Sequence, residues 1–92
     1  ARPVLGNSMH LLNQFYEALR DRLPGEIDLW VESETALTLR IGRCTLSTHQ
    51  RVGEAIGVLG LLTDQEINVV GEVLGDKEVL EPIGDEILCG IK

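Results

Sequence analysis

The residue types best suited to chemistry in this chain are a cysteine and a histidine five positions apart, Cys44 and His49. A thiol and an imidazole can act as a nucleophile and its general base when the chain turns between them. The sequence predicts a strand near Cys44 and a helix start near His49, and a helix start favours the thiolate. One alternative function is therefore a small thiol enzyme. Because no third group is implied to orient the imidazole, we expect Cys44 to be a core residue and the protein not to be an enzyme.

Metal and cofactor sites are not indicated by the other residues. A zinc site takes about four ligands with paired spacing, whereas this chain holds two cysteines and two scattered histidines. No phosphate-binding loop, dinucleotide fingerprint or calcium loop is present in the sequence. We expect no metal and no cofactor, and the sequence leaves open whether Cys44 and Cys89 form a disulfide.

The charge of the chain is concentrated in its second half. The net charge is −7, and residues 1–51 balance six arginines against six acids, whereas residues 52–92 carry nine acids against Lys77 and Lys92. Such a surface repels nucleic-acid phosphates and anionic membranes, and it attracts a basic protein surface. We therefore expect a protein partner and neither nucleic acid nor membrane. A second alternative is an acidic mimic of nucleic acid that inhibits a DNA-binding protein, and the plain alternative is that the charge only maintains solubility.

The length and composition indicate one compact domain over residues 1–92, with residues 1–6 as an arm. Hydrophobic residues make up 43% and aromatic residues 3% of the chain, so the core must be aliphatic. No apolar run approaches the ~20 residues of a membrane span. The opening residues lack the basic, apolar and small-residue pattern of a signal peptide. We expect a cytoplasmic protein.

The first half of the chain changes its hydrophobic period from helical to strand-like. Apolar residues at helical spacing predict a helix over 9–23, which Pro24 and Gly25 end. Strict alternation predicts strands over 26–32 and 35–42, joined as an antiparallel hairpin, and Cys44 with Leu46 indicates a short third strand. Trp30 falls on the polar face of this sheet, where it is either covered by another element or exposed at a contact surface.

The second half is predicted to be helical up to Gly75. Ser47 with Gln50 has capping-box spacing and precedes a helix over 52–62, and Thr63 with Glu66 marks a second helix over 63–75. Residues 76–92 are expected to form a short extended tail. The order predicts an α+β two-layer sandwich, with an N-terminal helix, an antiparallel hairpin or three-stranded sheet, and two further helices. This organisation resembles that of class I secretion chaperones, with which the chain shares no motif.

The run from Ala55 to Leu62 contains no charged or polar side chain. As a helix it would be apolar all round, which indicates burial on more than one side. It is then either a central core helix or a contact with a second copy or a partner. We expect a homodimeric adaptor, chaperone or inhibitor that binds its partner through this helix and the acidic half. The expected partner-binding residues are Trp30, Gly53, Gly57, Val58, Leu61, Leu62, Asp76, Glu78, Glu81, Asp85 and Glu86.

Overall fold

The structure, a computed structural model, describes residues 7–23, 25–49 and 52–91 of the chain. The expected arm at residues 1–6, Pro24 of the expected helix stop and Gln50 of the expected capping box lie outside these ranges. The elements in order are α1 (Asn7–Leu19), β1 (Ile27–Ser33), β2 (Ala36–Ile41), β3 (Cys44–His49), β4 (Ala55–Leu59), α2 (Asp64–Asp76), a 3-10 turn η2 (Glu78–Leu80) and α3 (Glu81–Ile91).

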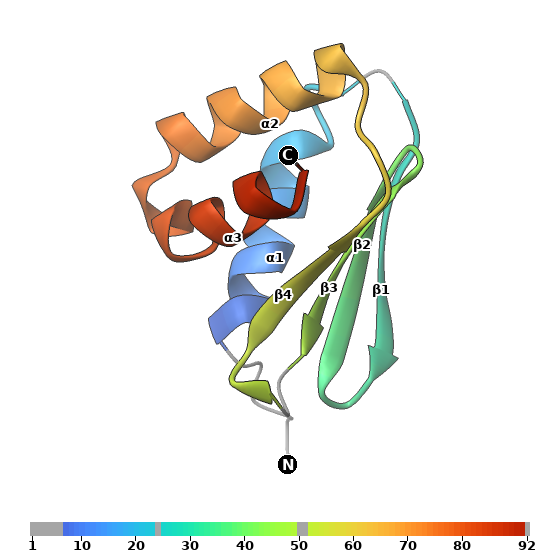
Figure 1. The fold of residues 1–92 in the computed structure, drawn as a ribbon, viewed down its shortest axis with the longest axis vertical. Coiled ribbons are helices and arrows are strands. Elements are labelled where there is room, and N and C mark those ends of the chain that lie inside the picture. The colour runs from blue at the N-terminus through green and yellow to red at the C-terminus, as the bar shows by residue number, and fades with distance from the viewer. Residues whose placement is uncertain (1–6, 24, 50–51, 92) are drawn as a thin grey trace.

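The architecture is the α+β two-layer sandwich that the sequence predicts, with four strands where two or three were expected. The strands form an antiparallel meander in the order β1-β2-β3-β4. The three helices lie together on one face of this sheet, and Figure 1 shows the other face bare. Side chains such as Phe15, Leu39 and Ile87, all fully buried, form one largely aliphatic core between the two layers.

The first helix and the hairpin confirm the sequence prediction, except at the ends of the helix. α1 ends at Leu19 rather than at residue 23, because Arg22 N–H donates to the Leu19 carbonyl at 2.9 Å and tightens the chain into a turn. At the other end, the Ser8 hydroxyl donates to the Glu54 carbonyl, and Asn7 N–H donates to Glu54 Oε2 at 3.0 Å. The start of α1 is thereby held by the turn between β3 and β4.

The predicted helix over 52–62 is wrong, and so is the helix start at Ser47. β3 continues to His49, and residues 55–59 form the edge strand β4, with Ser47 opposite Gly57 in the ladder. A short apolar run fits a buried helix and a strand equally by pattern, and the β-branched residues Ile56 and Val58 favour the strand. Gly53 at φ 79° and Glu54 at φ 60° make the turn that begins it.

The expected extended tail at 76–92 is also wrong, because the chain forms η2 and α3 there. Pro82 lies in the first turn of α3, where its missing N–H leaves no helical hydrogen bond unmade. Ile83 and Ile87, four residues apart, place one side of α3 in the core. The proline that suggested an edge strand therefore starts a helix.

The second predicted capping box is confirmed. Thr63 Oγ1 accepts from Glu66 N–H at 3.2 Å, and Glu66 Oε1 accepts from Thr63 N–H at 2.8 Å. The other carboxylate oxygen of Glu66 lies beside Gly42 in the turn between β2 and β3. The start of α2 is therefore fixed both by its cap and by this contact with the sheet.

Gly60 is the position at which the backbone demands glycine most strongly. Its φ is 105°, and a Cβ there would collide with the main-chain carbonyl of Arg43. We predict that Gly60→Ala lowers the free energy of unfolding by about 2 kcal/mol or more, from the unfavourable φ and the main-chain clash. Gly71→Ala, in the middle of α2 with no atom within 4 Å of the new Cβ, should raise it by about 0.5–1 kcal/mol. Urea unfolding of both variants measures the difference, and equal effects would contradict the placement of Gly60.

Candidate functional site

The most site-like feature of the described residues is a groove between α2 and α3. Its volume is about 330 Å³. The two helices lie next to each other on the helical face of the sheet (Figure 1), and each gives the groove a stripe of residues at helical spacing. Leu74 and Leu88 supply its apolar surface. The complete lining is Gly71, Leu74 and Gly75 of α2, Glu78 of η2, and Glu81, Gly84, Asp85 and Leu88 of α3.

The glycines leave the groove wide. A Cβ added at Gly71 or Gly75 would have no atom within 4 Å, and one at Gly84 would reach only Leu74 Cδ2, at 3.9 Å. The missing side chains therefore correspond to open space along the helices. Larger residues at Gly71 and Gly75, which are exposed, would narrow the groove without displacing the core, whereas Gly84 is buried.

The structure divides the five predicted acidic site residues into two groups. Glu78, Glu81 and Asp85 come together at the groove, and no described Lys or Arg forms an ion pair with them. The other two serve the fold. Asp76 lies 3.6 Å from Arg22, and Glu86 Oε2 accepts from the Ile56 N–H of β4 at 3.1 Å. The groove thus combines leucine surface with three carboxylates that lack a partner in the described chain.

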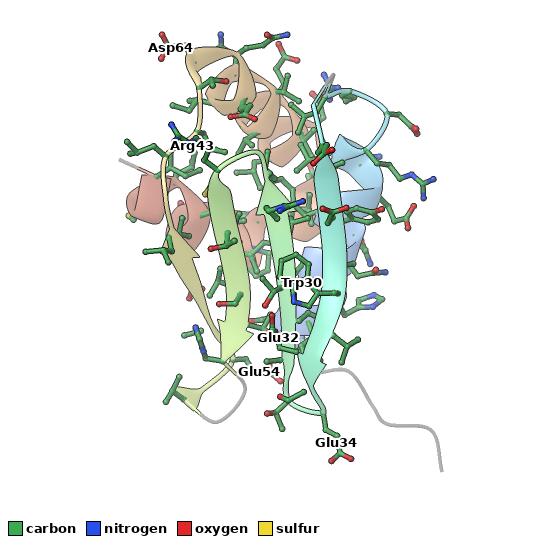
Figure 2. The ribbon with its side chains drawn as sticks, turned by 90° about the vertical axis from the view of Figure 1, so that its right-hand side faces the viewer. Trp30, Glu32, Glu34, Arg43, Glu54 and Asp64 are labelled. Atoms are coloured by element: carbon green, nitrogen blue, oxygen red, sulfur yellow. The ribbon has the colours of Figure 1, made fainter. Side chains whose placement is uncertain are left out.

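Trp30 and Gly57 lie on the bare face of the sheet. Trp30 is 38% exposed on β1, its indole N–H donates to Glu32, and it stands opposite Thr38 in the ladder (Figure 2). A Cβ at Gly57 would lie 2.6 Å from His49 Nε2, so the imidazole occupies the space that Gly57 leaves. Gly53 lies in the turn before β4. These residues are separate from the groove.

The apolar run at residues 55–62 has mixed burial rather than the burial on several sides expected of a helix. Val58 faces inward, where its side chain touches Gly90 of α3, and Leu62 is in the core. Leu59 and Leu61 are each 76% exposed. Part of the run therefore packs in the core, and Leu59 and Leu61 form an exposed apolar pair at the edge of the sheet.

Cys44 and His49 are not brought together. Cys44 is fully buried on the inner face of β3, whereas His49 is exposed at the far end of the strand, with Ser47 Oγ 3.3 Å from its Nε2 on the bare face. Burial, and secondarily the negative charge of Glu66, raises the pKa of the Cys44 thiol. A thiol with a raised pKa holds less thiolate at neutral pH, so the geometry and the electrostatics both oppose the thiol-enzyme alternative. Cys44 and Cys89 are both free thiols.

A second depression, of about 360 Å³, lies between α1 and η2. Its walls carry one carboxylate, Glu17, and one ammonium, Lys77, beside Ala18, Val79 and Leu80. The two charges are of opposite sign, so this depression has no charge preference of its own. The groove between α2 and α3 is the more specific of the two features.

Sequence analysis identified the carboxylates of the groove but missed its leucines and glycines. The helical spacing of these residues in the sequence could have indicated them. As a helix, residues 81–91 place positions 81, 84, 85 and 88 on one stripe, and residues 71, 74 and 75 form the matching stripe of α2. Because residues 76–92 were interpreted as extended, the stripe of α3 was not recognised. The stripe of α2 therefore had no predicted helix beside it.

No family model, curated protein or solved structure matches this chain. Within the described ranges no helix has the length and hydropathy to cross a membrane. The same ranges contain no cluster of three or more His, Cys, Asp or Glu side chains arranged to hold a metal ion.

We predict that the two thiols differ strongly in reactivity. In the native protein Cys89, which is exposed, should react with a disulfide reagent at least about tenfold faster than buried Cys44, which needs local opening. Ellman's reagent measures both rates, and Cys89→Ser should remove the fast one. Two equally fast thiols would contradict the burial of Cys44.

The raised pKa of Cys44 also predicts a pH dependence of stability. The folded state holds the thiol proton more tightly than the unfolded chain, so this residue's contribution is complete below the ordinary thiol pKa of about 8.5. It is lost as the pH rises through the folded pKa of Cys44. Urea unfolding between neutral pH and pH about 10 should show this decline. Its Cys44-dependent part should be absent in Cys44→Ala.

Proposed function

We propose that this protein is a non-enzymatic protein-binding module that takes a basic segment of a partner in the groove between α2 and α3. The observation that carries the proposal is the combination of Leu74 and Leu88 with Glu78, Glu81 and Asp85, none of which has a cationic partner in the described chain. An adaptor, chaperone or inhibitor working in the cytoplasm fits this surface.

The size of the groove limits what it can bind. Ligand pockets usually range over about 300–1,000 Å³, and this groove lies near the lower bound. It therefore suits one or two apolar side chains of a segment rather than a whole helix face. The three carboxylates are then placed to pair with basic residues that flank the apolar anchor, which raises the rate of encounter and the specificity.

The exposed pair Leu59 and Leu61 supports a second part of the proposal, that two copies of the chain associate. Both side chains are 76% exposed and two residues apart at the edge of the sheet. Neighbouring exposed leucines of this kind favour contact with another protein surface, and symmetric dimers are the commonest soluble oligomers. The dimer contact would then be separate from the groove.

The groove is tested with the peptide Lys-Lys-Leu-Lys-Lys, blocked at both ends, by calorimetry or fluorescence anisotropy. We predict that Gly71→Leu, which fills the groove, abolishes binding while the stability of α2 is kept or raised. Asp85→Asn with Glu78→Gln should weaken binding by about 3–10-fold, because each exposed ion pair contributes only a fraction of a kcal/mol to about 1 kcal/mol.

The matched control is Gln65→Leu, an exposed position on another side of α2, which should leave peptide binding unchanged. The peptide with Ser in place of Leu should bind more weakly, and the peptide with Glu in place of Lys should not bind. Binding that survives Gly71→Leu, or that ignores the sign of the peptide charge, would refute the assignment of the groove.

The dimer is tested by sedimentation at tens of micromolar. Leu61→Asp should yield a folded monomer, because the side chain is already exposed. Val58→Asp should instead lower the free energy of unfolding by about 2 kcal/mol or more, since it buries a charge between β4 and α3. A monomeric wild-type protein would remove the dimer from the proposal and leave the groove untouched.

A further inference from the structure

The two edge strands of the sheet, β4 and β1, differ in whether another element covers them. β4 lies against α3, and the Glu86 carboxylate accepts from the Ile56 N–H at 3.1 Å, so that edge is blocked by a helix and a side chain. β1 is the opposite edge, seven residues long, and no element of the described ranges lies alongside it (Figure 1). A long, uncovered edge strand is a template for pairing with another chain.

The ladder shows which backbone groups of β1 remain available. Gly42 N–H donates to the Glu26 carbonyl at 3.2 Å, so Glu26 directs its main chain toward β2. Because the direction alternates along an antiparallel strand, Asp28 and Trp30 also face β2, whereas Leu29 and Val31 direct their N–H and C=O groups outward. An added strand can therefore pair with Leu29 and Val31.

Val31 gives this edge an apolar position without cover. Ile27, Leu29 and Val31 alternate along the inner face of β1, and the first two pack against the core. Val31 is 68% exposed. An apolar side chain of an added strand would lie next to Val31 and extend the core beyond β1.

The charge beside the edge decides between a second copy and a different partner. Carboxylates occur at Glu26, Asp28, Glu32 and Glu34, and within the described residues Arg40 pairs with Glu26 and Asp28. In a two-fold pairing of β1 with itself centred on Leu29, Glu26 lies opposite Glu32. In the pairing centred on Trp30, Asp28 lies opposite Glu32. Both registers oppose like charges, which destabilises a ladder.

We propose that the free edge of β1 binds an extended, positively charged segment of a partner protein as a fifth strand. Its apolar residues lie on the core side near Leu29 and Val31. Its basic residues lie on the bare face beside Glu32, next to Trp30 (Figure 2). Main-chain pairing gives the affinity, and the alternation of apolar and basic residues gives the specificity. This surface is distinct from the groove between α2 and α3.

The test uses the blocked peptide Lys-Val-Thr-Val-Lys, which presents the same pattern in either strand direction. It should bind the wild-type chain and slow hydrogen exchange at the amides of Leu29 and Val31. Val31→Lys should weaken binding by about tenfold, through loss of the apolar contact and added like charge. Val52→Lys is the matched control, since Val52 is 69% exposed and precedes the opposite edge strand β4, and this variant should bind as the wild type does.

Two further peptides separate strand addition from general attraction. A version of the basic peptide that is N-methylated at both valines lacks the N–H groups that would pair with Leu29 and Val31, and it should not bind. The acidic peptide Glu-Val-Thr-Val-Glu should not bind either. The proposal is overturned if the basic peptide does not bind, or if Val31→Lys and Val52→Lys weaken it equally. It is also overturned if the amides of Leu29 and Val31 are already protected in the free protein, which would mean that the chain itself or a second copy covers the edge.

Discussion

The structure depends on burying one face of a four-stranded meander under a single layer of helices. Leu39 and Leu46 from the sheet meet Phe15 of α1, Val70 of α2 and Ile87 of α3 in one largely aliphatic core. Among the elements that the structure describes, none forms a second layer over the other face (Figure 1). The bare face, the uncovered edge at β1 and the groove between the two C-terminal helices are all consequences of this one-sided arrangement.

The acidic residues of the second half have different roles in this structure. Glu66 caps α2 and touches the turn between β2 and β3, and Glu86 satisfies a main-chain N–H of β4. Asp76 lies near Arg22. Three carboxylates without an ion pair in the described chain, Glu78, Glu81 and Asp85, lie together at the groove, next to leucine. A net charge alone says little about binding, whereas unpaired charges beside apolar surface indicate where a basic partner would gain most.

Local patterns predicted the fold where one periodicity stood out. The amphipathic repeat gave α1, strict alternation gave β1 and β2, and Thr63 with Glu66 gave the start of α2. The two errors arose where the pattern was ambiguous. The apolar run at β4 packs its inner side against α3, whereas Leu59 on its outer side is exposed, so the run shows neither the alternation of a half-buried strand nor the period of a helix. Pro82, which disfavours a central strand, is equally suited to the first turn of a helix, and the choice depended on tertiary packing of Ile83 and Ile87.

The candidate site was predicted in part for the same reason. Glu78, Glu81 and Asp85 were found from charge alone, but their grouping depends on α3 being a helix beside α2. The exposure of β1 was not predictable, since the sequence did not show which strands would be edges. Trp30 was expected to be covered by another element or exposed at a contact surface; it is 38% exposed on the bare face, and its role in a contact stays a prediction.

The most direct test of the central claim is a map of amide chemical shifts during titration with a basic segment that carries one leucine. Glycine amides fall in a separate region of the spectrum, so the groove can be followed at Gly71, Gly75 and Gly84 and compared with Gly53 and Gly57 near β4. The account predicts that the first three shift together and saturate while the other two stay in place. Shifts confined to Gly53 and Gly57, or no saturable change at the groove glycines, would contradict it.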